Sequence, residues 1–338
     1  MSIVRGGMSS RIEEESIESW RPSASLEHLA LRAEMLAKAR AFFRAHGVME
    51  VETPILCQAT VSDPNIQSLH THYTPPYGAA DRMLYLHTSP EFAMKRLLAS
   101  GSGAIYQITK VFRDGEQGRL HNPEFTMIEW YRPGINYVAL MDEVEMLVSQ
   151  LTGTVASQRL TYAEGFRRQT GFDPHDASVL ELRNYALAHG LKSGNPRGDD
   201  RDTYLDFILV NQVAPTLGKD CLTFIYDYPA SQATLADISP ANAAVSERFE
   251  LFMGGIEIAN GASELTDPAE HRRRFNRDLS KRRQRGSDAV PWDERYLAAV
   301  DSGLPPCAGV ALGFDRLVMV HAGVSDVADV LPFPVGQA

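Results

Sequence analysis

A short stretch in the first half of the chain, residues 112–125, concentrates side chains that can bind anions. Arg113 lies near the start of this stretch, where an apolar run ends. A guanidinium there can hold a phosphate or carboxylate through two parallel hydrogen bonds. The alternating patterns of residues 105–112 and 125–131 predict flanking β-strands, and Pro133-Gly134 ends the second. The sequence therefore predicts a hairpin whose long tip presents Arg113 to a negatively charged ligand.

The second predicted strand places a carboxylate among large side chains. Residues two apart in a strand share a face. The face in question carries Phe125, Met127, Glu129 and Tyr131. A core strand that tolerates one glutamate has the same pattern, although acids are seldom fully buried without a partner. The nearby Arg113 favours a pocket.

Two glutamates further along the chain can share one cation. If Gly254-Gly255 form a two-residue hairpin loop, Phe252 is opposite Glu257. By the same register, Glu250 is opposite Ala259. The two acids are then diagonal neighbours with Cβ atoms about 7 to 8 Å apart. Mg²⁺ prefers one or two carboxylates plus substrate phosphates, so it is the expected ion. Paired surface glutamates without a metal remain an alternative.

The elements that position these groups follow from apolar periodicity. Ser25 is the predicted N-cap of a helix over residues 26–46 with Gly47 as its stop signal, and residues 48–54 are predicted to be a strand. Ser89 is the predicted N-cap of a second helix that starts at Pro90.

The remaining chain mixes helical and strand patterns. Residues from about 138 to 217 are predicted to be mainly helical and to form an insertion beside the sheet, and residues 223–229 return to strand. Residues 272–285, which are predicted to be helical, contain eight arginines or lysines and a single acid, Asp278. This stretch is either a solvated basic face or a docking patch for an acidic partner or RNA.

Composition bounds the class of protein. With 338 residues, 44% of them hydrophobic, the chain is long enough for one large domain. Its formal net charge of -10 argues against a generic nucleic-acid binder. Cys57, Cys221 and Cys307 have no paired spacing, which fits a reducing cytoplasm. The acidic segment 1–21 has no periodic apolar face and is predicted to be a mobile tail, and no apolar run is long enough for a membrane.

Several of these segments resemble class II aminoacyl-tRNA synthetases. The hairpin over residues 105–131 resembles motif 2 in its lysyl-tRNA synthetase version, and residues 309–316 resemble motif 3. Residues 255–267 resemble the strand before motif 3. Residues 26–54 resemble motif 1, which forms the dimer interface in those enzymes, so a homodimer is expected. Order and spacing agree from about Ser25 to the C-terminus.

The resemblance implies an α+β fold, with a mainly antiparallel sheet flanked by helices, formed by residues 22–338. An anticodon-binding OB-fold would need roughly another hundred residues, so none is expected. A catalytic core alone is typical of the lysyl-tRNA synthetase paralogues that activate (R)-β-lysine or lysine with ATP. These paralogues transfer it to the ε-amino group of a lysine on translation elongation factor P.

The resemblance also assigns roles to residues. Catalytic roles are expected for Arg113, Glu257 and Arg316. The expected amino-acid pocket comprises Ser89, Pro90, Glu91, Glu129, Tyr131, Asn260, Glu264 and Ala311. In it, Glu91 takes the amino group near the carboxylate, and Glu264 with Tyr131 receives the distal ammonium. ATP is expected at Arg113, Asp114, Gly115, Asn122, Phe125, Glu257, Ile258, Gly313 and Arg316, with adenine between Phe125 and Arg316. Mg²⁺ is expected at Glu250 and Glu257.

The chain departs from the synthetases at informative positions. Leu120 replaces the usual arginine, so the γ-phosphate contact falls to either Arg119 or His121. Asp114-Gly115 replaces Asn-Glu, so an adenine contact is missing or comes from Glu116. Ala311 replaces glycine and, like Ser231-Gln232-Ala233, resembles the ligase paralogues. Two alternatives stay open: a minimal lysyl-tRNA synthetase that charges tRNA, and an inactive synthetase-like regulatory binding protein. The retained acids and arginines count against the second, and tRNA is not the expected acceptor.

Overall fold

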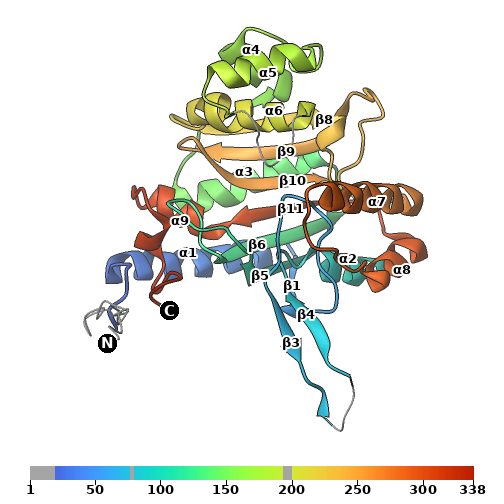
Figure 1. The fold of residues 1–338 in the computed structure, drawn as a ribbon. Coiled ribbons are helices and arrows are strands. Elements are labelled where there is room, and N and C mark those ends of the chain that lie inside the picture. Colours follow the sequence, from blue (N-terminus) through green and yellow to red (C-terminus); the bar gives the residue numbers. More distant parts are fainter. Residues whose placement is uncertain (1–19, 77–79, 193–199) are drawn as a thin grey trace, which may run out of the picture.

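The computed structural model describes residues 20–76, 80–192 and 200–338 (Figure 1). Its centre is a sheet in the strand order β1-β5-β6-β11-β10-β9-β8-β7. Only the β1/β5 and β7/β8 pairs are parallel, so the expected mainly antiparallel α+β fold is confirmed. The predicted N-terminal tail, residues 1–21, falls almost wholly on residues 1–19, which lie outside the described part.

The strands and helices have the following bounds. The large sheet contains β1 (Met49–Glu50), β5 (Ile105–Phe112), β6 (Glu124–Pro133), β11 (Cys307–Gly313), β10 (Ile256–Ser263), β9 (Val245–Met253), β8 (Leu222–Pro229) and β7 (Ser157–Thr161). A smaller sheet, which projects from the body in Figure 1, contains β2 (Leu56–Cys57), β4 (Arg82–Leu86) and β3 (His70–Tyr73). The helices are α1 (Leu26–Ala45), α2 (Glu91–Ala99), α3 (Tyr137–Thr152), α4 (Tyr162–Thr170), α5 (Val179–Ala188), α6 (Arg201–Ile208), α7 (Pro268–Gln284), α8 (Glu294–Gly303) and α9 (Phe314–His321).

One face of the large sheet packs against α1, α3 and α9 and forms the main core. On β6 the residues that point into this core are Ile128 and Trp130, both fully buried. The alternate residues of β6 point to the opposite face, as the period-two pattern predicted. That opposite face is consequently left free to form a binding site.

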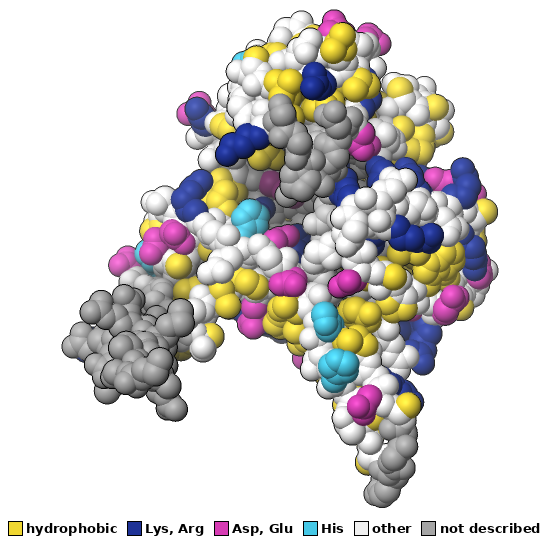
Figure 2. Space-filling view, viewed as in Figure 1, with side chains coloured by type: hydrophobic (Ala, Val, Ile, Leu, Met, Phe, Trp, Pro, Cys, Tyr) yellow, Lys and Arg dark blue, Asp and Glu magenta, His cyan; other side chains and the backbone are white. Residues whose placement is uncertain are grey.

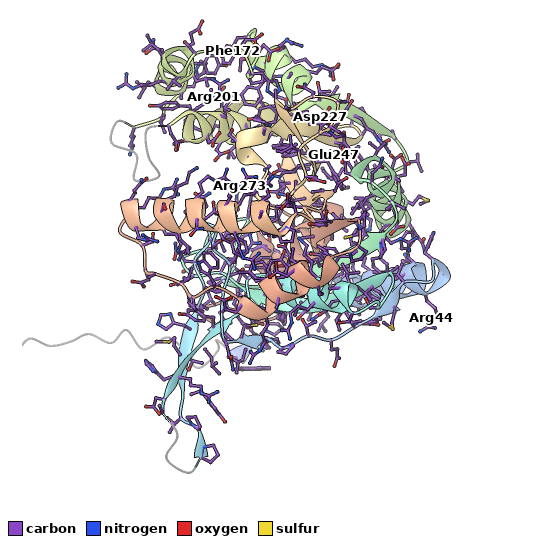
Figure 3. All side chains as sticks on the ribbon, turned by 90° about the vertical axis from the view of Figure 1, so that its right-hand side faces the viewer. Arg44, Phe172, Arg201, Asp227, Glu247 and Arg273 are labelled. Atoms are coloured by element: carbon purple, nitrogen blue, oxygen red, sulfur yellow. The ribbon has the colours of Figure 1, made fainter. Side chains whose placement is uncertain are left out.

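A second hydrophobic core lies beyond β8, where α4, α5 and α6 pack together. Figure 3 shows Phe172 and Arg201 in this helical unit, with Arg273 of α7 on the side of the molecule below it. Residues of both α6 and α7 line one cleft. Within the described residues, none of the helices is both long and apolar enough to cross a lipid bilayer.

The start of α1 follows the prediction, whereas the strand after it does not. The Ser25 Oγ accepts a 3.1 Å hydrogen bond from the N–H of His28 and caps the helix. The strand predicted over residues 48–54 shrinks to Met49–Glu50. Val51 N–H still donates to the Tyr106 carbonyl, but Pro54 has no N–H and restricts the residue before it, so the ladder does not continue.

The start of α2 is shifted by one residue from its predicted place. Pro90 is the N-cap and the helix begins at Glu91. The predicted cap, Ser89, still contributes, since its Oγ accepts a 3.0 Å hydrogen bond from the Glu91 N–H. This turn brings Glu91 to the face of the sheet that the core helices leave free.

Candidate active site

The free face of the sheet forms the floor of a cleft of about 990 Å³. Strands β6, β10 and β11 supply the floor, and the walls come from residues 61–66, α6 and α7. Figure 2 shows Lys and Arg side chains gathered where α7 lies. Two residues of α7, Arg277 and Lys281, and its C-cap Arg285 line the cleft. The predicted basic helix therefore borders the site.

A row of polar side chains crosses the floor because the strand registers align them. Ala311 on β11 pairs with Glu129 on β6 and with Asn260 on β10, and Asn260 pairs with Glu250 on β9. The predicted pairing of Glu250 with Ala259 is wrong, because a β-bulge near residue 258 shifts the register by one. The predicted two-residue loop and the pairing of Phe252 with Glu257 are confirmed.

Arg113 presents donors to the cleft that have no strong partner in the protein. Its nearest carboxylate, Glu116, is 3.8 Å away, and its buried Nε has no hydrogen-bond partner among the described residues. The guanidinium lies over the Phe125 ring, with 5.1 Å from Cζ to the ring centroid. A buried unpaired donor of this kind is costly unless a ligand satisfies it. Arg113 is therefore placed to hold an anion above an aromatic platform.

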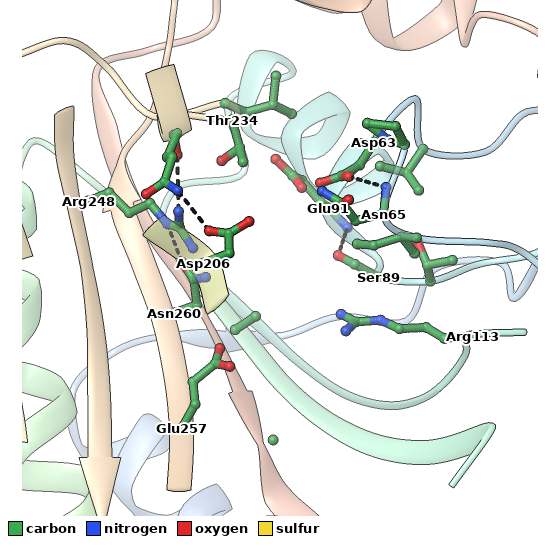
Figure 4. Close-up of a pocket in the computed structure, with 18 of the residues that line it drawn as sticks. Asp63, Asn65, Ser89, Glu91, Arg113, Asp206, Thr234, Arg248, Glu257 and Asn260 are labelled. Atoms are coloured by element: carbon green, nitrogen blue, oxygen red, sulfur yellow. Dashed lines mark hydrogen bonds between the residues drawn. The ribbon is translucent and has the colours of Figure 1, made fainter. Parts of the chain in front are cut away.

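Figure 4 shows Arg113 with Ser89 and Glu91 on one side of the cleft, and Arg248, Asn260 and Glu257 on the other. The acids of the expected amino-acid pocket take part in short hydrogen bonds. Glu129 accepts hydrogen bonds from Ser89 Oγ at 2.7 Å and from the Tyr131 hydroxyl at 2.6 Å. Burial and the charge of Glu91 raise the pKa of Glu129 to about 8. Together with Glu264, these residues form a buried acidic pocket suited to ammonium groups.

The sequence analysis missed Lys95, which lies in this pocket. Its side chain is fully buried, and its Nζ lies 2.5 Å from a carboxylate oxygen of Glu91 and 2.5 Å from one of Glu264. The signal that could have revealed it is the spacing of four residues between Glu91 and Lys95 on one helix.

Gly309 was also missed, although it decides the shape of the pocket. A Cβ atom there would lie 2.3 Å from Tyr131 Cε1 and 2.4 Å from Glu264 Oε1. Both atoms belong to the predicted site for the distal ammonium, so the glycine makes room for that site.

Gly309→Ala is expected to raise KM for the amino acid in adenylate formation by about 10²-fold, since displacing a binding group by about 1 Å has costs of that order. The added methyl pushes Tyr131 and Glu264 away from their positions. The apparent Kd for ATP should change little. Pyrophosphate exchange at varied amino-acid and ATP concentrations separates the two effects. An equal loss for both substrates would mean that the substitution acts on the whole sheet.

The side of the cleft that is expected to bind the nucleotide contains Phe125 and, from α9, Arg316. Arg316 donates to His121 Nε2 at 2.6 Å, and its Nη1 lies 3.7 Å from a carboxylate oxygen of Glu257. Burial and the charge of Arg316 lower the pKa of His121. At Gly313, a Cβ atom would make only ordinary contacts, at 3.7 Å and 3.9 Å, so the space beside it is open on the cleft side.

Some predicted site residues lie away from the wall of the cleft. Those that line it are Arg113, Asn122, Phe125, Glu257, Ile258, Gly313, Arg316, Ser89, Glu91, Glu129, Tyr131, Asn260, Glu264 and Ala311. Those absent from its lining are Pro90, Asp114, Gly115 and Glu250. Asn122 already bonds within the protein: its Nδ2 donates to the Glu124 carbonyl and its Oδ1 accepts from the Val335 N–H. Through these two hydrogen bonds, Asn122 holds its loop in position.

Of the two candidates for the γ-phosphate contact, only His121 lines the cleft. Arg119 instead donates to the Ser325 carbonyl at 2.9 Å. The alternative adenine contact, Glu116, does line the cleft.

The predicted metal-binding pair has a cationic neighbour that the sequence analysis missed. Arg248 Nη2 lies 2.6 Å from Glu250 Oε1, and its Nε donates to Asn260 Oδ1 at 3.2 Å. Burial and the charge of Glu257 still raise the pKa of Glu250 to about 7. Two repelling carboxylates beside an amide fit a divalent cation whose remaining ligands come from phosphates. Within the described residues, no cluster of three or more His, Cys, Asp or Glu side chains forms a complete metal site.

The chain belongs to the class II tRNA synthetase family, since residues 8–337 match the family of tRNA synthetases class II (D, K and N). A relative from Yersinia enterocolitica is 48% identical over 321 residues, which cover 95% of this chain and 98% of the relative. A relative from Proteus mirabilis is 46% identical over 322 residues, with 95% and 99% covered. One from Hamiltonella defensa is 45% identical over 320 residues, with 95% and 98% covered. All three bear the name elongation factor P-(R)-β-lysine ligase.

Proposed function

We propose that this chain is an ATP-dependent ligase that activates (R)-β-lysine or lysine and transfers it to translation elongation factor P. The acceptor is the ε-amino group of a lysine on that protein. The named relatives support the reaction, since they match nearly the whole chain. The observation that carries the proposal is a single cleft that joins Arg113, whose buried Nε has no hydrogen-bond partner among the described residues, to three buried or half-buried acids: Glu91, Glu129 and Glu264.

The first step joins the amino-acid carboxylate to the α-phosphate of ATP and releases pyrophosphate. Both reacting groups are negative, and two unit charges about 4 Å apart repel by about 4 kcal/mol at an effective dielectric of 20. Arg113 supplies a cation with free donors where these groups meet. The acids hold the amino groups, so the carboxylate is aligned with the phosphate, and alignment with charge stabilisation suffices for the displacement.

Mg²⁺ is part of this proposal, with Glu257 and Glu250 as the residues that would hold it. When bound, it would neutralise phosphate charge and favour departure of pyrophosphate. Glu257 lines the cleft with a side chain that is 40% exposed, so it is accessible to a nucleotide-bound ion. Glu250 is buried behind Glu257, and its carboxylate already forms an ion pair with Arg248.

The second step transfers the aminoacyl group to the acceptor amine and releases AMP. Incubation of the enzyme with ATP, labelled (R)-β-lysine or lysine, and either elongation factor P or tRNA tests the acceptor. We expect label on elongation factor P and none on tRNA. Label on tRNA alone would replace the proposal with a minimal lysyl-tRNA synthetase.

Ala311→Gly is expected to shift activation from (R)-β-lysine toward lysine by about tenfold in the ratio of kcat/KM values. One methyl in a pocket is worth about 1–3 kcal/mol of discrimination, and the Ala311 methyl lies between Glu129 and Asn260 in the row across the floor. Pyrophosphate exchange with each isomer measures the ratio. An unchanged ratio would mean that another position sets the choice between the isomers.

The proposal extends to the organisation of the protein. Residues 22–338 form one catalytic domain, and the helical segment at about 138–217 is an insertion beside the sheet. The enzyme acts in the cytoplasm as a homodimer. Support for the dimer comes from two exposed apolar side chains in the segment that resembles motif 1, Leu26 and Met49.

A further inference from the structure

The buried lysine of α2 joins the two acids to which the proposed function assigns the two amino groups of the substrate. Lys95 is 0% exposed, and its Nζ contacts Glu91 Oε1 and Glu264 Oε2, each at 2.5 Å. Both acids also line the cleft. In each acid, one carboxylate oxygen therefore forms an ion pair with Lys95 and the other does not.

We propose that Lys95 is a built-in counter-ion that holds Glu91 and Glu264 ionised and in place, so that their second oxygens receive the two ammonium groups of a diamine. This inference rests on the proposed function, because it requires a diamine substrate. Lys95 is a positioning residue, since it acts on the substrate through the two carboxylates.

The electrostatics of the pocket explain why such a residue is needed. Three acids lie close together there, and burial with the charge of Glu91 raises the pKa of Glu129 to about 8. Burial also raises the pKa of Glu264, and the charge of Lys95 opposes that rise and limits it to about 7. Burial alone would lower the pKa of Lys95, but the carboxylates of Glu264 and Glu91 outweigh it and raise that pKa well above its ordinary value. The lysine thus stays charged at neutral pH. Without it, the two acids would share a proton, because like charges in one buried site cannot both ionise at ordinary pH.

Other titratable groups face Lys95 or its partners from neighbouring elements. They are Glu129 and Tyr131 on β6, His271 on α7, Tyr296 on α8, Cys307 on β11 and Asp237 beside Glu264. Burial lowers the pKa of His271 to about 4 and raises that of Cys307 to about 12. Neither group changes charge between pH 7 and 9. Glu129 and Glu264 do so in this range, and since the charge of Lys95 lowers the pKa of both, loss of Lys95 shifts both titrations to higher pH.

Lys95→Met tests the inference because it removes the charge and keeps most of the volume. The measurement is KM for the diamine in pyrophosphate exchange from pH 7 to 9, divided by the wild-type KM at each pH. A protonated acid cannot receive an ammonium group, so the loss is largest at low pH. We expect a ratio of at least about tenfold at pH 7 that falls by up to about tenfold per pH unit as pH rises. Lys95→Arg keeps the charge and should give a flat ratio.

A ratio for Lys95→Met that does not change with pH would overturn the inference, since a packing defect has no reason to titrate. If Lys95→Met does not fold, the double variant Lys95→Met with Glu264→Gln is expected to fold, because it removes the uncompensated acid as well. A double variant that is equally unfolded would also overturn it. Absence of exchange by the wild type with either lysine isomer would instead refute the proposed function.

Discussion

Arg113→Lys is expected to lower kcat for adenylate formation by about 10³-fold. Lysine keeps the positive charge but cannot donate the two parallel hydrogen bonds of a guanidinium, and it loses the flat contact with Phe125. Removal of one preorganised donor to a developing charge has costs of 10²–10³ in kcat, and here geometry and donor number change together. Single-turnover formation of adenylate measures the rate without the transfer step.

The matched control for this variant is Arg295→Lys. Arg295 is an exposed arginine on α8 that donates to Gln58 and lies outside the lining of the cleft. Its replacement should leave kcat unchanged. If Arg113→Lys behaved like the control, Arg113 would have no part in the displacement, and the unpaired Nε would need another explanation.

Glu264→Gln is expected to lower kcat/KM for lysine or (R)-β-lysine by about 10³-fold. The amide has the shape of the acid but not its charge, so a buried ammonium loses its partner, and loss of one member of a buried charge pair costs roughly 2–5 kcal/mol. The same substitution also removes a partner of Lys95. Pyrophosphate exchange over a range of amino-acid concentrations gives kcat/KM.

The selectivity of Glu264→Gln between lysine and norleucine shows whether the substitution affects recognition of the distal ammonium or damages the enzyme in general. Norleucine has the carbon chain of lysine but no distal ammonium, so the gap in kcat/KM between lysine and norleucine should narrow greatly in Glu264→Gln. Glu294→Gln, at the exposed start of α8, is the matched control and should preserve the gap. A full gap in Glu264→Gln would mean that the distal ammonium binds elsewhere.

Local patterns predicted those parts of the site that lie within one strand or one helix start. The period of two on β6 placed Glu129 and Tyr131 on the cleft face and Trp130 in the core. Ser25 predicted the start of α1 because a cap depends on a few adjacent residues. These features need no knowledge of how distant segments pack.

Features that depend on packing between elements were missed or misplaced. The bulge near residue 258 moved Glu250 from Ala259 to Asn260, and no local pattern marks a bulge of this kind. Lys95 looked like an ordinary helix lysine, and only the folded structure shows that Glu264, the residue after β10, contacts it. Gly309 looked like a motif glycine, and only the positions of Tyr131 and Glu264 reveal the space it leaves.

Pyrophosphate exchange by the wild-type protein tests the central claim most directly. The assay contains ATP, Mg²⁺ and one amino acid at a time: (R)-β-lysine, lysine or norleucine. The cleft, with its acids for two ammonium groups and with Arg113 as a cation for the reacting anions, predicts exchange with at least one of the two diamines and none above background with norleucine. Exchange with neither diamine, or equal exchange with norleucine, would contradict the account.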